Sequence, residues 1–244
     1  MNINYSFLIT SLAGFSTLIG SLIILFNFKN IKNIIIFSLS FSSGVMITMS
    51  LLDLLFESIR FYNKSYNTYL SILLFLIFFI LGSFLISLFD KIKFKDNNLY
   101  KVGIVSMIGI IFHNIPEGII TFITSSIDRK LGLSIALAIS LHNIPEGISI
   151  AVPIYYSTNK KTKAIIYTFI SAISEILGAA LSYIFLKKYI SNFLIGMLLS
   201  LVCGIMSYIS IFELVPEALK YNNKKLFYVS FFIGSLFMII SLII

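Results

Sequence analysis

Charged side chains are scarce in this chain of 244 residues. Asp, Glu, Lys and Arg together make up 11% of the sequence, whereas 58% is hydrophobic and the mean hydropathy is +1.00. A soluble domain of this length does not need so large a share of hydrophobic residues, so the composition indicates a polytopic membrane protein. Long polar stretches are missing as well, which excludes a separate soluble domain.

Eight apolar segments account for most of the chain. A helix that crosses a bilayer needs about 20 apolar residues, and each segment is close to that length. We therefore expect an all-α protein with eight transmembrane helices, forming one transmembrane domain over residues 1–244. The segments cover residues 6–28, 34–56, 68–89, 102–124, 131–155, 164–186, 191–214 and 226–243.

Cysteine is nearly absent. The single residue, Cys203, lies in the seventh apolar segment and has no partner for an internal disulfide, so we interpret it as a small packing residue. A basic stretch before the first apolar segment is missing too, and that segment is too long for a cleaved signal peptide. We expect it to be kept as a membrane span.

Lys and Arg are absent from the interiors of the eight segments, and all 18 of them lie in the links. A net charge of +8 distributed in this way reflects membrane topology and the lipid surface, so we expect no nucleic-acid partner. One set of alternate links carries twelve cations: Lys29, Lys32, Lys91, Lys93, Lys95, Lys101, Lys160, Lys161, Lys163, Lys220, Lys224 and Lys225.

The other set of links carries half as many cations. These six are Arg60, Lys64, Arg129, Lys130, Lys187 and Lys188. Because the links richer in Lys and Arg normally face the cytoplasm, the bias predicts a multi-pass protein of the cell membrane with both termini outside the cytoplasm.

Histidine occurs only twice, and both copies belong to one repeated motif. The hexapeptide HNIPEG stands at residues 113–118 and 142–147, inside the fourth and fifth apolar segments. In each copy the imidazole and the carboxylate are four residues apart and share a helix face. The proline before each Glu frees the backbone carbonyl four residues earlier. The two pairs are His113 with Glu117 and His142 with Glu146.

Three carboxylates lie near the middles of the fourth, fifth and sixth segments. Glu117, Glu146 and Glu175 have no basic partner in the span interiors, so they require protons or bound cations. Imidazole with carboxylate suits zinc and its first-row neighbours, and the amides of Asn114 and Asn143 extend the choice towards iron and manganese. Calcium and magnesium more usually avoid histidine.

An internal repeat links the second and seventh segments. Residues 44–57 (GVMITMSLLDLLFE) align without gaps on residues 204–217 (GIMSYISIFELVPE). The aligned segments cross the membrane in opposite directions, as do the two HNIPEG copies. The pattern predicts an inverted repeat, the architecture of many transporters with a binding site at midplane. Its acids would line the entry and exit: Asp53 opposite Glu213 and Glu57 opposite Glu217.

These motifs together resemble the ZIP family of divalent metal transporters, and most closely its short bacterial ZupT-like branch. The resemblance covers eight spans, the doubled HNxPEG motif, SEILGA around Glu175 and the repeated stretch in the second segment. It implies a 3+2+3 inverted-repeat arrangement, uptake of a divalent metal into the cytoplasm, an elevator-like motion and, as in many relatives, a homodimer. Zinc would be the main substrate, with iron, manganese, cobalt and cadmium as further candidates and no other cofactor.

The resemblance also implies a binuclear site. One position would use His113, Glu117, His142 and Glu146. The other would use Asn114, Asn143 and Glu175, with Glu117 and Glu146 bridging. One departure concerns the residue after Glu175, where Ile176 replaces the proline found in many family members.

Other interpretations compete with transport. Paired His and Glu residues around a metal would also serve an intramembrane metal-dependent hydrolase, but a duplicated site with acids towards both membrane faces fits a path better than a reaction centre, so we expect no enzyme. A structural or assembly protein would explain the hydrophobicity but not the unpaired acids. Locally, the histidines could be packing residues, and the asparagines could hydrogen-bond neighbouring helices.

Overall fold

The computed structural model describes residues 3–91, 97–186 and 191–243 and is helical throughout these ranges, apart from short links. Within these ranges eight helices are long and apolar enough to cross a membrane, which confirms the predicted number. They are Ile3–Leu25, Ile31–Asn63, Thr68–Asp90, Asn98–Ile127, Arg129–Thr158, Lys161–Ile184, Asn192–Leu219 and Lys224–Ile243. Four of the cations used for topology, Lys93, Lys95, Lys187 and Lys188, lie outside the described residues.

Four of the membrane-length helices contain short stretches of other helical geometry. The elements are α1 (Ile3–Ser21), η1 (Leu22–Leu25), α2 (Ile31–Met49), η2 (Ser50–Leu54), α3 (Leu55–Asn63), α4 (Thr68–Asp90), α5 (Asn98–Ile127), α6 (Arg129–Thr158), α7 (Lys161–Leu181), η3 (Ser182–Leu186), α8 (Asn192–Tyr208), η4 (Ile209–Leu214), α9 (Val215–Leu219) and α10 (Lys224–Ile243). Both η2 and η4 are π-helical and lie within the two stretches that the sequence aligns.

Several helices extend beyond the apolar segments. The fourth span begins at Asn98 rather than at 102, because the side chain of Asn97 accepts a hydrogen bond from the Tyr100 amide and caps the helix. This start brings Lys101 into the first turn of α5. The expectation that every cation lies in a link is therefore wrong at Lys101. It is also wrong at further cations that lie near helix ends: Lys32, Arg60, Arg129, Lys130, Lys161, Lys163, Lys224 and Lys225.

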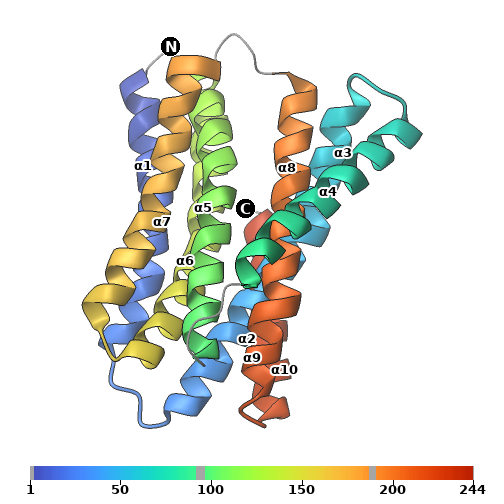
Figure 1. Cartoon of the computed structure of the whole chain (residues 1–244). Helices are drawn as coiled ribbons and strands as arrows, with labels where there is room; N and C mark the ends of the chain where they lie inside the picture. The colour runs from blue at the N-terminus through green and yellow to red at the C-terminus, as the bar shows by residue number, and fades with distance from the viewer. Residues whose placement is uncertain (1–2, 92–96, 187–190, 244) are drawn as a thin grey trace.

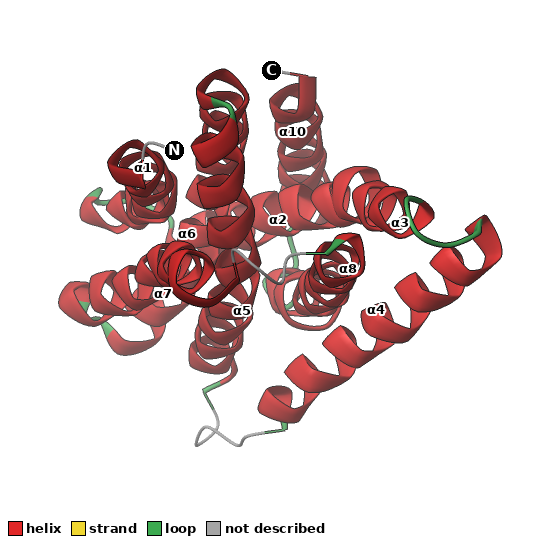
Figure 2. Ribbon diagram, turned by 90° about the horizontal axis from the view of Figure 1, so that it is seen from above, coloured by secondary structure: helices red, strands yellow, loops and turns green. Residues whose placement is uncertain are grey.

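The helices form two groups (Figure 1). In the first group, α1 and α5 each pack on α6 and α7, and α6 also packs on α7. In the second, α2 packs on α10 and α4 packs on α8. The view from above shows α1, α5, α6 and α7 gathered together and α4 crossing the far side beyond α8 (Figure 2). The fourth and fifth spans, with the HNIPEG motifs, thus lie in one group.

Burial differs sharply between the helices. The most apolar window of α4 is 17% buried and that of α10 is 28% buried, whereas the corresponding window of Ile31–Asn63 is 78% buried. Exposed Leu, Ile and Phe side chains cover α4 and α10, as expected for surfaces in contact with lipid. The polar side chains are instead concentrated inside the bundle, where the site lies.

Candidate metal centre

Both HNIPEG motifs lie in the middle of 30-residue helices, α5 and α6, that pack against each other. Their functional side chains are buried inside the bundle: His113, Asn114, Glu117, His142, Asn143 and Glu146. The i, i+4 spacing brings each imidazole and carboxylate to the helix face that meets the other helix. The predicted convergence of the two motifs is therefore present.

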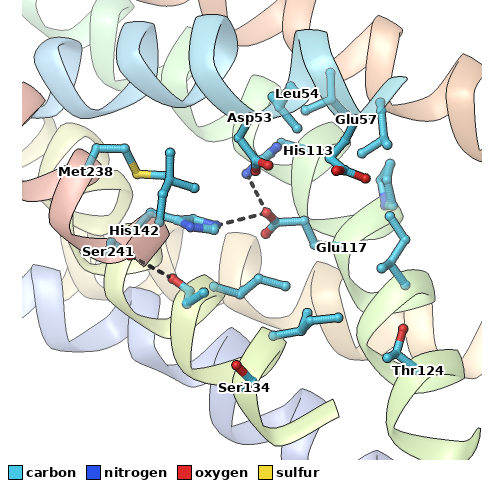
Figure 3. Close-up of a pocket in the computed structure, with 18 of the residues that line it drawn as sticks. Asp53, Leu54, Glu57, His113, Glu117, Thr124, Ser134, His142, Met238 and Ser241 are labelled. Carbon is cyan, nitrogen blue, oxygen red and sulfur yellow. Dashed lines mark hydrogen bonds and ion pairs between the residues drawn. The ribbon is translucent and has the colours of Figure 1, made fainter. Parts of the chain in front are cut away.

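Glu117 lies between the two imidazoles (Figure 3). Its Oε1 atom is 2.9 Å from His142 Nε2 and 3.2 Å from His113 Nε2. The same nitrogen of His113 lies 3.0 Å from Oε1 of Glu146. One ligand atom from each of His113, Glu117 and His142 falls within 4.8 Å of the others. Two imidazoles and the Glu117 carboxylate thus lie close enough together to hold one divalent ion, and Glu146 adjoins them at His113.

The two asparagines use their amide groups in the same way. Asn114 Nδ2 donates to the Ser171 carbonyl of α7 at 3.1 Å, and Asn143 Nδ2 donates to the Ala13 carbonyl of α1 at 3.0 Å. Asn143 Nδ2 also donates to Oε2 of Glu175 at 2.9 Å. Glu175 is fully buried, and this hydrogen bond places its carboxylate beside Asn143.

Several buried oxygens of these groups have no hydrogen-bond partner among the described residues. They are Asn114 Oδ1, Asn143 Oδ1, Glu117 Oε2, both carboxylate oxygens of Glu146 and Glu175 Oε1. Buried polar atoms are normally paired, and unpaired carboxylates in an apolar interior are especially unfavourable. This set of oxygens next to two imidazoles fits a site that holds divalent cations, which would satisfy them.

The last residue of each motif sets the distance to a neighbouring helix. A Cβ atom at Gly118 would lie 1.9 Å from the Glu175 carbonyl oxygen of α7, and one at Gly147 would lie 1.9 Å from the Thr17 carbonyl oxygen of α1. A side chain at either position would push the helices apart. The glycine of the first motif therefore fixes the backbone of Glu175 beside α5.

A cavity of about 490 Å³ adjoins the histidines and Glu117. It lies between the two helix groups, with α5 and α6 on one side and η2, α3, α8 and α10 on the other. Asp53 and Glu57, two of the acids predicted to lie on a path, line this cavity, and Figure 3 shows both carboxylates near His113 and Glu117. Glu57 also forms a 2.9 Å ion pair with Arg60, one helical turn away.

The aligned acids of the seventh span, Glu213 and Glu217, have a different environment from Asp53 and Glu57. Glu213 is 4% exposed, and its Oε1 lies 3.3 Å from Lys101 Nζ. Lys101 also contacts Asp90, whose other carboxylate oxygen accepts a 2.7 Å hydrogen bond from the Tyr208 hydroxyl. Glu217 pairs with Lys220, one turn later.

Asp90, Lys101 and Tyr208 were not among the candidate site residues, and the sequence used Lys101 only as a topology signal. One signal was available: an asparagine three residues before Tyr100 is a typical helix cap, and a helix starting there would have included Lys101. No sequence signal pairs Lys101 with Glu213, because the two residues are brought together only by packing of α5 against η4.

Comparisons with known proteins identify the family of this chain. Residues 90–242 match the model of a family described as ZIP zinc transporter. A zinc transporter ZupT of Clostridium perfringens is 35% identical over 100% of this chain and 96% of its own length. Proteins of the same name from Streptococcus mutans and Chlorobium chlorochromatii are 36% and 34% identical, and each alignment covers at least 97% of both chains. This chain belongs to the ZIP zinc transporter family.

Proposed function

We propose that this protein carries zinc across the membrane into the cytoplasm through the buried centre between α5 and α6. The observation that carries the proposal is the convergence of His113, Glu117, His142 and Glu146 at the end of a cavity between two helix groups. Imidazole and carboxylate ligands bind zinc and its first-row neighbours. Iron, manganese, cobalt and cadmium are therefore the further candidate substrates.

A second ion position is built from Asn114, Asn143 and Glu175. The support is that both amide nitrogens are used by backbone carbonyls, while the amide oxygens have no hydrogen-bond partner among the described residues. Glu117 and Glu146 would bridge the two ions, since each has a second oxygen beyond the one close to histidine. The centre is then binuclear and its occupant is the transported substrate.

Two pairs of matching helix contacts support an inverted repeat and, with it, alternating access. A Cβ at Gly44 would lie 2.2 Å from the Phe231 carbonyl oxygen, and one at the aligned Gly204 would lie 2.0 Å from that of Phe79. Matching hydrogen bonds run from Ser235 to the Gly44 carbonyl and from Ser83 to the Gly204 carbonyl. These pairs relate α2 and α10 to α8 and α4, as the 3+2+3 arrangement requires.

The family consists of transporters, so the intramembrane hydrolase is set aside. The site itself supports this choice. His113 and Glu117 on α5 are repeated by His142 and Glu146 on α6, whereas a reaction centre needs distinct groups with distinct roles. A duplicated ligand set between helices of opposite direction suits a cation that enters from one side and leaves on the other.

Metal flux into liposomes tests the proposal. Liposomes that contain the purified protein should accumulate zinc. Glu117→Ala or His142→Ala should lower the initial rate of zinc uptake at least about 10- to 100-fold, which is the range for losing groups that merely support metal ligands. Asp128→Asn is the matched control, because asparagine also caps a helix and Asp128 caps α6 at its start. Unchanged flux in both alanine variants would reject the site, and no flux of any metal by folded protein would reject transport.

A further inference from the structure

Lys101 links the two helix groups by charge. It stands in the first turn of α5, in the same group as the metal centre, and its ammonium reaches Asp90 at the end of α4 and Glu213 in η4. In the described part of the chain, every ion pair that joins the two groups involves Lys101. Tyr208 fixes Asp90 from the other side through its hydroxyl.

The cavity and this charge cluster lie on opposite sides of the metal centre. The cavity is lined by Thr124 near the end of α5 and by Leu131 and Ser134 near the start of α6. Lys101 stands at the other end of α5, close to the end of α6, where Asn97 Nδ2 donates to the Ser157 carbonyl at 3.3 Å. The helix groups are thus separated at one end and joined by ion pairs at the other.

The acid that Lys101 contacts is the counterpart of a cavity residue. Glu213 aligns with Asp53, and both stand in π-helical turns. Asp53 lines the open cavity on one side of the centre, so Glu213 occupies the matching position on the closed side. In the repeat, a transported cation that passes Asp53 on one side would pass Glu213 on the other. The ammonium of Lys101 lies at that second position.

We propose that Lys101 is a tethered cation that closes the second half of the path and is displaced when that half opens. Opening at this end requires α5 to move relative to α4 and η4, which separates the ammonium from Asp90 and Glu213. The two carboxylates then face the path without a cation and attract the divalent ion that leaves the centre. The inference rests on the proposed function, because it assumes a path that opens alternately at its two ends.

Thiol labelling reports the opening independently of metal flux. Cys203→Ala removes the native cysteine, which is buried. Ser149→Cys then reports on the closed side, since Ser149 shares a helix face with His142 and Glu146 and is fully buried. Ser134→Cys reports on the cavity that it lines. Rates of reaction with a small, water-soluble thiol reagent are measured on detergent-purified, metal-free protein.

Lys101→Gln should raise the labelling rate at Ser149→Cys about tenfold or more and lower it at Ser134→Cys. The expected change in labelling rate lies within the 5- to 150-fold range that is typical of coupling between two sites of a protein with two global states. Lys101→Arg keeps the charge and should stay close to the parent rates. Lys91→Gln is the matched control, because Lys91 stands next to Asp90 in the chain, is exposed and forms no ion pair with another described residue.

Exchanging the charges of Lys101 and Glu213 distinguishes the loss of an ion pair from a loss of packing. Lys101→Glu should open the closed side, and Lys101→Glu combined with Glu213→Lys should restore slow labelling at Ser149→Cys. If Lys101→Gln does not fold, the neutral pair Lys101→Gln with Glu213→Gln is decisive and should give the same shift. Unchanged rates at both reporters, or an equal change in Lys91→Gln, would overturn the proposal. Because labelling needs no metal, loss of zinc flux in the parent protein would instead count against the function.

Discussion

At the scale of single residues, the geometry of the two motif asparagines is compatible with both roles that the sequence left as alternatives. Their nitrogens hydrogen-bond the backbones of neighbouring helices, Asn114 to α7 and Asn143 to α1. These bonds fix the orientation of each amide, so the oxygen is the atom left to contact a cation. Hydrogen bonding between helices and metal ligation are therefore compatible, because they use different ends of one side chain.

The second ion position can be tested at Glu175. Glu175→Gln should reduce the bound zinc from two ions per chain to one, because an amide supplies less negative charge than the carboxylate that Asn143 now contacts. Calorimetric titration of metal-free protein measures the stoichiometry. Ser174→Ala is the control, since this buried neighbour hydrogen-bonds only within α7. Two ions per chain in Glu175→Gln would exclude Glu175 as an essential ligand.

At the scale of elements, the close approach of α5 to α7 depends on glycine. Gly118 meets the Glu175 carbonyl, and Gly178 of α7 meets the Ile115 carbonyl of α5, with Cβ positions 1.9 and 2.1 Å from the oxygens. Each helix thus presents a glycine to the backbone of the other. Helix packing in membranes commonly relies on such small residues, and here the contact also positions Glu175.

Gly118→Ala should therefore destabilise the protein by about 1–3 kcal/mol, the usual cost of inserting a methyl group where the neighbours cannot move. Gly103→Ala in the same helix is the matched comparison. Its Cβ would first meet the flexible end of Ile154, at 2.7 Å, so a small side-chain shift can accommodate it. Alanine also favours the helix over glycine by about 1 kcal/mol. Equal midpoints of thermal unfolding for the two variants would contradict this role of Gly118.

At the scale of the whole molecule, two helix groups enclose the centre, with a cavity on one side and the Lys101 ion pairs on the other. This asymmetry indicates a protein open at one end of its path. The large apolar surfaces of α4 and α10 suit contact with lipid, and a homodimer stays a prediction from the family resemblance. Which end faces the cytoplasm is predicted by the distribution of Lys and Arg.

Membrane orientation can be measured with two cysteines in the Cys203→Ala background. Ser65→Cys lies in the exposed link before α4 and should react with a membrane-impermeant maleimide in intact cells. Thr162→Cys is exposed at the start of α7, next to Lys161 and Lys163, and should react only after permeabilisation. Labelling of both after permeabilisation shows that both sites are reachable. The reverse pattern in intact cells would place the termini in the cytoplasm.

The sequence by itself determined the number of spans and named the candidate ligands of the site. Hydropathy is a local property, so eight membrane-length helices follow from composition in each window. The HNIPEG spacing places His and Glu on one helix face whatever the surrounding fold. The convergence of the two motifs was predictable because the chain has only two histidines, both in the same motif on successive spans.

Tertiary structure alone decided which distant groups meet. The pairing of Lys101 with Glu213 depends on the exact start of α5 and on its packing beside η4, and neither is encoded in a local pattern. The contact of Asn143 with Glu175 likewise depends on how α6 and α7 are set against each other. Side chains more than 30 residues apart are placed by the sum of many helix contacts, so local sequence names the candidates and packing selects the partners.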